Sequence, residues 1–231
     1  MLRSVGSKLW SSSAMLAPYL VATQPPVGRT VLELGAGTGV CGLVAHAMCG
    51  PSKVVHTDGD PKALKLLRHN LALNQGQSQG LGPRPSRAQV LRGKHAHLLS
   101  WSSRADTRKP LAAHGDVAAA GGFDVVIGSD ILYEERAVTP LWGTVGRLLR
   151  HSDATPAPVF ILAYEDRFSG LLARAVAVGI AAGFACEHVA AAGKGVVPSG
   201  LIDLGVSVEP GSGDWAKIKL LLCHREAAPT R

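Results

Sequence analysis

The sequence predicts an α/β fold in which seven strands form a mostly parallel sheet with helices on both faces. Short apolar runs alternate with longer segments that carry apolar residues at helical spacing, and this alternation is typical of strand–helix–strand units. The connections are long enough for parallel strands, which are buried on both sides. The composition, 46% hydrophobic and 18% charged over 231 residues, excludes a disordered chain.

The expected strands are the short apolar runs. They are Thr30–Leu34, Lys53–Thr57, His95–Trp101, Phe123–Gly128, Val159–Tyr164, Phe184–Ala190 and Lys217–Cys223. Helical patterns fill four of the gaps, at Val40–Met48, Pro61–Asn74, Glu134–Arg150 and Arg167–Ala182. In the second of these helices, Leu64, Leu67 and Leu71 share one face, Asp60 is the expected N-cap and Pro61 suits the first turn.

The chain is expected to be a single domain, residues 1–231, with a flexible basic insertion at 75–94. The segment Gln75–Gly93 is rich in Gln, Gly, Ser and Pro. The formal net charge is +7, and residues 75–110 hold seven basic residues against one acid. This charge fits either a positive lip facing an acidic or RNA-bound partner, or a solvated loop with no partner.

Several classes of protein and site are disfavoured. The four cysteines form no CxxC pair and no zinc pattern, which favours reduced thiols. The apolar stretches are too short or too interrupted to span a bilayer, and the start of the chain lacks a secretory core. His95 and His97 share a strand face without an evident third ligand, so no metal is expected. We expect a cytoplasmic protein; the nucleus and an organelle transit peptide are the alternatives.

A glycine-rich loop follows the first strand, and an acid follows the second. Gly35, Gly37 and Gly39 can adopt positive φ and let backbone amides approach a ligand. Asp58 lies nineteen residues beyond Gly39, where a carboxylate can accept both ribose hydroxyls of an adenosine. The loop and the acid together predict a nucleotide-cofactor site.

Two cofactor classes use this geometry. Gly37-x-Gly39-x-x-Gly42 fits the dinucleotide fingerprint, which keeps a dinucleotide-binding oxidoreductase as an alternative. Glu33, two residues before the glycines, is unfavourable beside a pyrophosphate but suits the cationic amino-acid end of S-adenosylmethionine. A buried Glu33 also needs a cationic or hydrogen-bonding partner, and a bound amino group or a neighbouring loop amide would serve. These residues favour S-adenosylmethionine.

The sequence resembles the seven-β-strand protein-lysine methyltransferases of the METTL type. The resemblance is carried by VLELGAGTGV at 31–40, HTDGDPKALKLLRHNLALN at 56–74 and DVVIGSDILYEE at 124–135. LWSSSAMLAPYL at 9–20 and LLSW at 98–101 are similar to two further family segments. The resemblance implies a Rossmann-like class I methyltransferase fold and a protein substrate, acidic or associated with the ribosome or an elongation factor.

The resemblance also implies roles for individual residues. The cofactor contacts it implies are Trp10, Glu33, Gly35, Ala36, Gly37, Gly39, Asp58, Trp101 and Ser129. Asp58 would hold the ribose and Trp101 would flank the adenine. Asp130 and Tyr133, the ends of the family's Asp-x-x-Tyr signature, would orient the acceptor nitrogen.

Alternatives stay open at this point. Asp130 could instead cap the helix that starts near Glu134, and Arg167 could face solvent or pair with an acid such as Glu165. A nucleic-acid methyltransferase is the rival enzyme, although Asp130-Ile131-Leu132-Tyr133 lacks the prolines typical of base-amine methylation. The third class is a cofactor-binding scaffold without turnover. We expect a monomeric protein-lysine methyltransferase that does not associate with a membrane.

Overall fold

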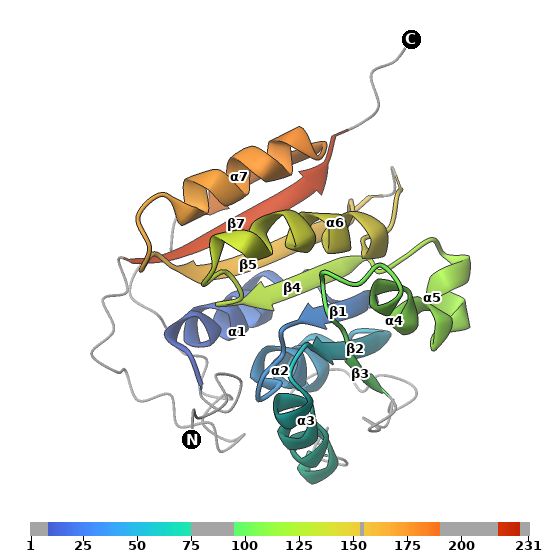
Figure 1. Ribbon diagram of the computed structural model, residues 1–231. Coiled ribbons are helices and arrows are strands. Elements are labelled where there is room, and N and C mark those ends of the chain that lie inside the picture. The colour runs from blue at the N-terminus through green and yellow to red at the C-terminus, as the bar shows by residue number, and fades with distance from the viewer. Residues whose placement is uncertain (1–8, 75–94, 153–154, 190–216, 227–231) are drawn as a thin grey trace.

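A computed structural model describes residues 9–74, 95–152, 155–189 and 217–226; the predicted basic insertion at 75–94 lies outside them. Seven strands form one sheet in the order β3-β2-β1-β4-β5-β7-β6 (Figure 1). The strands are β1 (Thr30–Leu34), β2 (Lys53–Asp58), β3 (Ala96–Leu98), β4 (Val125–Ser129), β5 (Val159–Glu165), β6 (Phe184–Val189) and β7 (Ile218–Arg225). The run from β3 to β5 is parallel, and β7 is antiparallel to both neighbours. The predicted α/β fold is confirmed.

The helices include the four that were predicted and three that were not. They are α1 (Ser11–Thr23), α2 (Val40–Cys49), α3 (Pro61–Leu73), α4 (Lys109–Ala112), α5 (Gly115–Ala119), α6 (Val138–Leu148) and α7 (Leu171–Ala181). Short 3₁₀ helices span Asp106–Arg108 and Glu135–Ala137. Helices α1, α4 and α5 were not predicted. The last two helices begin four residues later than the sequence pattern indicated.

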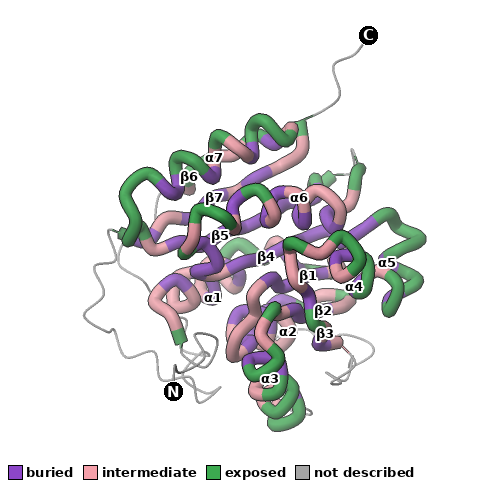
Figure 2. The backbone as a smooth tube through the Cα atoms, viewed as in Figure 1, coloured by how far each residue is buried: buried purple, intermediate pink, exposed green. Residues whose placement is uncertain are grey.

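Apolar side chains on alternate strand positions face two different helix layers. On β1, Val31 belongs to a cluster with residues of α1 and α2, whereas Leu32 belongs to a cluster with residues of α6 and α7. Both side chains are fully buried. Figure 2 shows the strands as a largely buried layer between helices with exposed outer surfaces. The sheet is therefore covered on both faces, as expected from its continuous apolar runs.

Local chemistry explains where α3 begins. The Asp60 side chain accepts a hydrogen bond from the Lys62 amide at 2.8 Å, and Pro61 occupies the first helical position. Both features satisfy or remove backbone donors that a helix start leaves unpaired. The predicted N-cap is confirmed, and it fixes the chain direction directly after Asp58.

The parallel register brings the carboxyl ends of four strands to one edge of the sheet. Leu34 of β1 lies opposite Gly128 of β4, and Asp58 of β2 lies opposite Leu98 of β3. The segments after these strands therefore meet at that edge, which is where open α/β sheets bind ligands. Over the described segments, no helix is long and apolar enough to cross a membrane.

Candidate cofactor and acceptor site

A cavity of about 660 Å³ opens at this edge of the sheet. Ten of the predicted site residues line it: Trp10, Glu33, Gly35, Ala36, Gly37, Asp58, Trp101, Ser129, Asp130 and Tyr133. Asp60, Ser100 and Glu134 also line it and were not predicted. All three lie within the segments at 56–74, 98–101 and 124–135 that resemble the family. The sequence alone did not separate them from the other residues of those segments, whereas the structure places them beside the cavity.

Gly39 is absent from the described cavity lining. Gly39 is the N-cap of α2 and has a φ of +82°. A Cβ at this position would lie 2.4 Å from Cδ1 of Leu67. Gly39 is therefore needed for the approach of α3 to the glycine loop. Its predicted contact with the cofactor stays a prediction.

Asp58 is tied to the glycine loop on one side and to the start of α3 on the other. One carboxylate oxygen accepts from the Gly37 amide and the other from the Asp60 amide, each at 2.8 Å. Burial raises the pKa of Asp58 above the ordinary value of 3.8, and the two amide hydrogen bonds offset this only in part. The loop is thus held by the same carboxylate that is predicted to bind ribose.

Glu33 finds its partner on the neighbouring strand. Its Oε2 lies 2.6 Å from Nδ1 of His56, and both side chains are buried. The expected cationic or hydrogen-bonding partner of Glu33 is thus His56, which stands directly opposite it in the β1–β2 ladder, and the contact with a bound amino group stays a prediction. A Cβ on Gly42 would lie 2.3 Å from His56, so this glycine leaves room for the pair.

Asp130 turns the chain out of β4 in a left-handed conformation, with φ +56°. Its amide donates to the carbonyl of Ala163 at 2.8 Å, which fixes the turn against β5. Asp130 is not a helix cap, because the following helical segments are preceded by Glu134 and Ala137. Its side chain is 2% exposed, and Oδ1 has no hydrogen-bond partner among the described residues.

Arg167, in the segment after β5, contacts two of the residues that line this end of the cavity. Its Nη2 pairs with Oδ2 of Asp130, and its guanidinium lies 4.7 Å from the centre of the Trp10 ring. Glu165, the partner suggested by the sequence, is 3.9 Å away. Ser129 directly precedes Asp130, and its hydroxyl lies 3.0 Å from that of Ser13 in α1.

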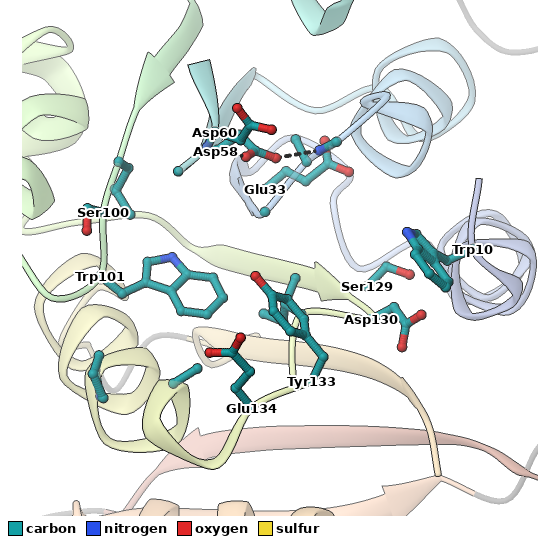
Figure 3. Close-up of a pocket in the computed structure, with 18 of the residues that line it drawn as sticks. Trp10, Glu33, Asp58, Asp60, Ser100, Trp101, Ser129, Asp130, Tyr133 and Glu134 are labelled. Carbon is teal, nitrogen blue, oxygen red and sulfur yellow. Dashed lines mark hydrogen bonds between the residues drawn. The ribbon is translucent and has the colours of Figure 1, made fainter. Parts of the chain in front are cut away.

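Tyr133 lies between the two ends of the cavity. In Figure 3, Asp58, Asp60 and Trp101 lie toward one end, and Trp10, Ser129 and Asp130 toward the other. Tyr133 is 53% exposed. Burial of its hydroxyl raises the pKa of Tyr133, and the negative charges of Glu134 and Asp58 raise it further. The phenol is therefore protonated at neutral pH and can donate or accept a hydrogen bond.

The described residues around the cavity give it a negative character. Five of them are acids, Glu33, Asp58, Asp60, Asp130 and Glu134, whereas Arg136 is the basic member of the described lining. Such a cavity favours cations and disfavours phosphate. His95, His97 and His114 lie close together near β3, with 3.2 Å between Nε2 of His97 and Nε2 of His114. In the described part of the chain, no group of three or more ligating side chains could hold a metal ion.

Comparison with known proteins gives the family. The model of the lysine methyltransferase family matches residues 1–170. The chain belongs to this family. It is 30% identical over 166 residues to human protein-lysine N-methyltransferase EEF2KMT, covering 71% of this chain and 46% of that protein. It is 29% identical over 165 residues to mouse protein N-lysine methyltransferase METTL21A, covering 71% and 62%.

The solved structures agree on the fold of this lysine methyltransferase family member. The ribosomal protein L11 methylase of Lactobacillus delbrueckii subsp. bulgaricus aligns with a TM-score of 0.53 at 16% identity, over 93% of this chain and 79% of that one. The predicted class I methyltransferase fold is confirmed. The chain spans about half the length of several curated relatives that it matches.

Membership of the lysine methyltransferase family confirms the predicted cofactor, S-adenosylmethionine. The residues that line the cavity of this lysine methyltransferase family member suit S-adenosylmethionine. Gly35 and Gly37 have positive φ and bring backbone close to the cavity. The carboxylate of Asp58 lies at the same wall, and Trp101 offers an indole at the same end of the cavity (Figure 3).

Proposed function

We propose that the protein transfers a methyl group from S-adenosylmethionine to the ε-amine of a lysine in another protein. The observation that carries this proposal is the cavity itself. Carboxylates line it from the glycine loop to Asp130, in a member of the lysine methyltransferase family. Both a sulfonium and a lysine side chain are cationic in water, so a negative cavity attracts both.

The same charge argues against the two rival substrates. Glu33, Asp58 and Asp60 lie beside the glycine loop, where a dinucleotide would place its pyrophosphate. A nucleic acid would have to bring its phosphates to a mouth that holds Glu134 and Asp60. These contacts favour a cationic acceptor.

When bound, S-adenosylmethionine would supply a methyl group for the amine lone pair, with the electron pair of the carbon–sulfur bond left on sulfur and the proton of the methylated amine released to solvent. We assign Asp58 to the ribose, Trp101 to the adenine and Gly35–Gly37 to the methionine end. Trp10, Glu33 and Ser129 would complete the wall. This assignment is supported by their common place on the cavity.

Asp130 and Tyr133 would orient the acceptor. The unpartnered Oδ1 of Asp130 is an available hydrogen-bond acceptor, and the protonated phenol of Tyr133 can accept from an amine N–H. Lysine has an ordinary pKa near 10.4, so about 0.04% is neutral at pH 7. The site must therefore select the neutral amine and hold it in line, and positioning of this kind supplies much of the rate in such reactions.

We also propose an acidic acceptor protein, such as one associated with the ribosome or an elongation factor, and action in the cytoplasm as a single-domain monomer. Arg104 and Arg108 follow the cavity-lining residues Ser100–Ser102 directly and add positive charge outside the negative cavity. The free thiols of Cys41 and Cys49 fit a reducing compartment.

Incubation of the protein with a cell lysate and S-adenosylmethionine labelled in its methyl group tests the proposal. We expect label in a discrete protein band, unchanged by nuclease and lost with protease. Label that disappears with nuclease would support the nucleic-acid alternative instead. An Asp130→Ala variant serves as the negative control.

A further inference from the structure

Asp130, which lines the cavity at the end proposed to receive the acceptor, forms an ion pair with Arg167. The carboxylate comes from the end of β4 and the guanidinium from the segment after β5, thirty-seven residues later. Asp130 is 2% exposed at its side chain, whereas Arg167 is 31% exposed and its Cζ lies 4.7 Å from the centre of the Trp10 ring. The guanidinium thus occupies one carboxylate oxygen of Asp130, and the other oxygen has no hydrogen-bond partner among the described residues.

We propose that Arg167 is a positioning residue that occupies Asp130 so that the acceptor lysine, which is attracted to the cavity as a cation, binds beside Asp130 without its proton. This inference rests on the proposed function. A bare carboxylate would bind the ammonium form of lysine, which has no lone pair and cannot accept a methyl group. Arginine stays charged at every pH of interest, so the pair presents little net charge to the incoming amine.

Several titratable groups near the Asp130–Arg167 pair are neutral or already paired, so they do not compete for its two charges. Glu165, Tyr164 and Asp166 lie near it on β5 and its end, and Tyr133, Glu134 and Glu33 line the same cavity as Asp130. Glu134 is paired with Arg136. Burial raises the pKa of Tyr164 and of Tyr133, so both phenols are neutral. Glu33 is paired with His56. From α1 and its start, Trp10 and Ser13 contribute uncharged groups.

Glu165 is the other acid close enough to form an ion pair with Arg167. It lies 3.9 Å from the guanidinium, whereas Asp130 is in direct hydrogen-bond contact. Stacking on Trp10 favours a cation at this position independently of either carboxylate. Removal of the guanidinium should therefore leave the Asp130 carboxylate without its ion-pair partner.

The consequence is a specific pH effect. In Arg167→Ala, the acceptor lysine should pair with Asp130 as an ammonium, so the bound amine should lose its proton only at higher pH. A displacement of about one pH unit corresponds to a tenfold lower rate near pH 7. The difference between the two rates should narrow as the pH rises toward 10, because a growing fraction of the bound amine is then neutral in the variant.

Two measurements test the proposal. The first is binding of n-butylammonium at pH 7 to the protein saturated with S-adenosylhomocysteine, with n-butanol as the uncharged comparison. Arg167→Ala should bind n-butylammonium about tenfold more tightly than the wild type and n-butanol equally. Arg167→Lys should restore the wild-type affinity. Arg174→Ala, which removes an exposed arginine paired with Glu135, is the matched control and should behave as wild type.

The second measurement is the rate of label transfer to the lysate band between pH 7 and pH 10. Unchanged n-butylammonium affinity, together with an equal loss of rate at every pH, would show that Arg167 only supports the fold. If Arg167→Ala does not give a cooperative melting transition, Arg167→Gln takes its place in both measurements with the same expectations. Absence of any labelled protein would contradict the proposed function, while the binding measurement would still decide the role of Arg167.

Discussion

Glu33 and His56 stand opposite each other on β1 and β2, and their side chains meet at 2.6 Å between Oε2 and Nδ1. The absent side chain of Gly42 leaves the space for this contact, because a Cβ there would lie 2.3 Å from His56 and 2.6 Å from Glu33. The third glycine of the GxGxxG pattern is thus explained by a buried pair between strands, and it does not indicate a dinucleotide.

Gly42→Ala should destabilise the protein by about 1–3 kcal/mol, since an added methyl group in a packed interior forces its neighbours to move. Urea unfolding followed by circular dichroism measures the change. Gly115→Ala is the control, because a Cβ at Gly115 would contact nothing within 4 Å. Equal stability of the two variants would show that the Glu33–His56 pair moves freely.

Asp58→Ala should weaken binding of both S-adenosylmethionine and S-adenosylhomocysteine. Each hydrogen bond to a charged carboxylate contributes about 1.5–3 kcal/mol, so the loss should be at least tenfold in affinity. Calorimetry measures it, with the exposed Glu187→Gln as control. Tight binding of NAD without binding of S-adenosylmethionine would refute the cofactor assignment.

The same carboxylate gives cofactor binding a pH dependence. The ionised form accepts the ribose hydroxyls, and burial raises the pKa of Asp58 above 3.8. Affinity should therefore be complete above this raised pKa and be lost as the pH falls through it, at a higher pH than an ordinary aspartate would give. Titrations at several pH values check this, and a loss that occurs only below pH 3.8 would contradict it.

Asp130→Ala and Tyr133→Phe should reduce methyl transfer more than they reduce cofactor affinity. Misplacement of the acceptor by Asp130→Ala should lower turnover about 100-fold, and the loss of one hydrogen bond in Tyr133→Phe about tenfold. Single-turnover kinetics and calorimetry separate the two quantities. Equal losses in both would assign Asp130 to cofactor binding or folding.

Replacement of Arg84, Arg87, Arg92 and Lys94 by Ser should raise the apparent KM for the protein substrate and flatten its salt dependence. These residues lie outside the described part of the chain, and the prediction rests on their charge alone. Exposed charges accelerate encounter with acidic surfaces, and salt screens them over about 8 Å. An unchanged KM at low salt would identify a solvated insertion without a role in recognition.

The sequence predicted the sheet well because each strand is a compact apolar run with glycine or proline close by. Helix α1 was missed because it contains Pro18 and opens with three serines, both poor signals for a helix interior. Tertiary contacts stabilise it instead. Leu16 and Leu20 are fully buried against the sheet, and Ser13 contacts Ser129.

The cavity-lining positions were largely predictable, whereas the partners within them were not. Motifs place residues at strand ends, and parallel strands bring those ends together. The pairing of Glu33 with His56 depends on register, and that of Asp130 with Arg167 depends on how the segment after β5 turns back. Neither is encoded at a short sequence spacing, so both required the structure.

Amino-acid analysis tests most directly whether lysine is the methylated residue. Lysate protein labelled by the wild-type enzyme is hydrolysed in acid, and the labelled product is identified by chromatography against methylated amino-acid standards. We expect label in methylated lysine, and much less of it with Asp130→Ala. Label in methylated arginine, histidine or nucleosides, with none in lysine, would contradict it.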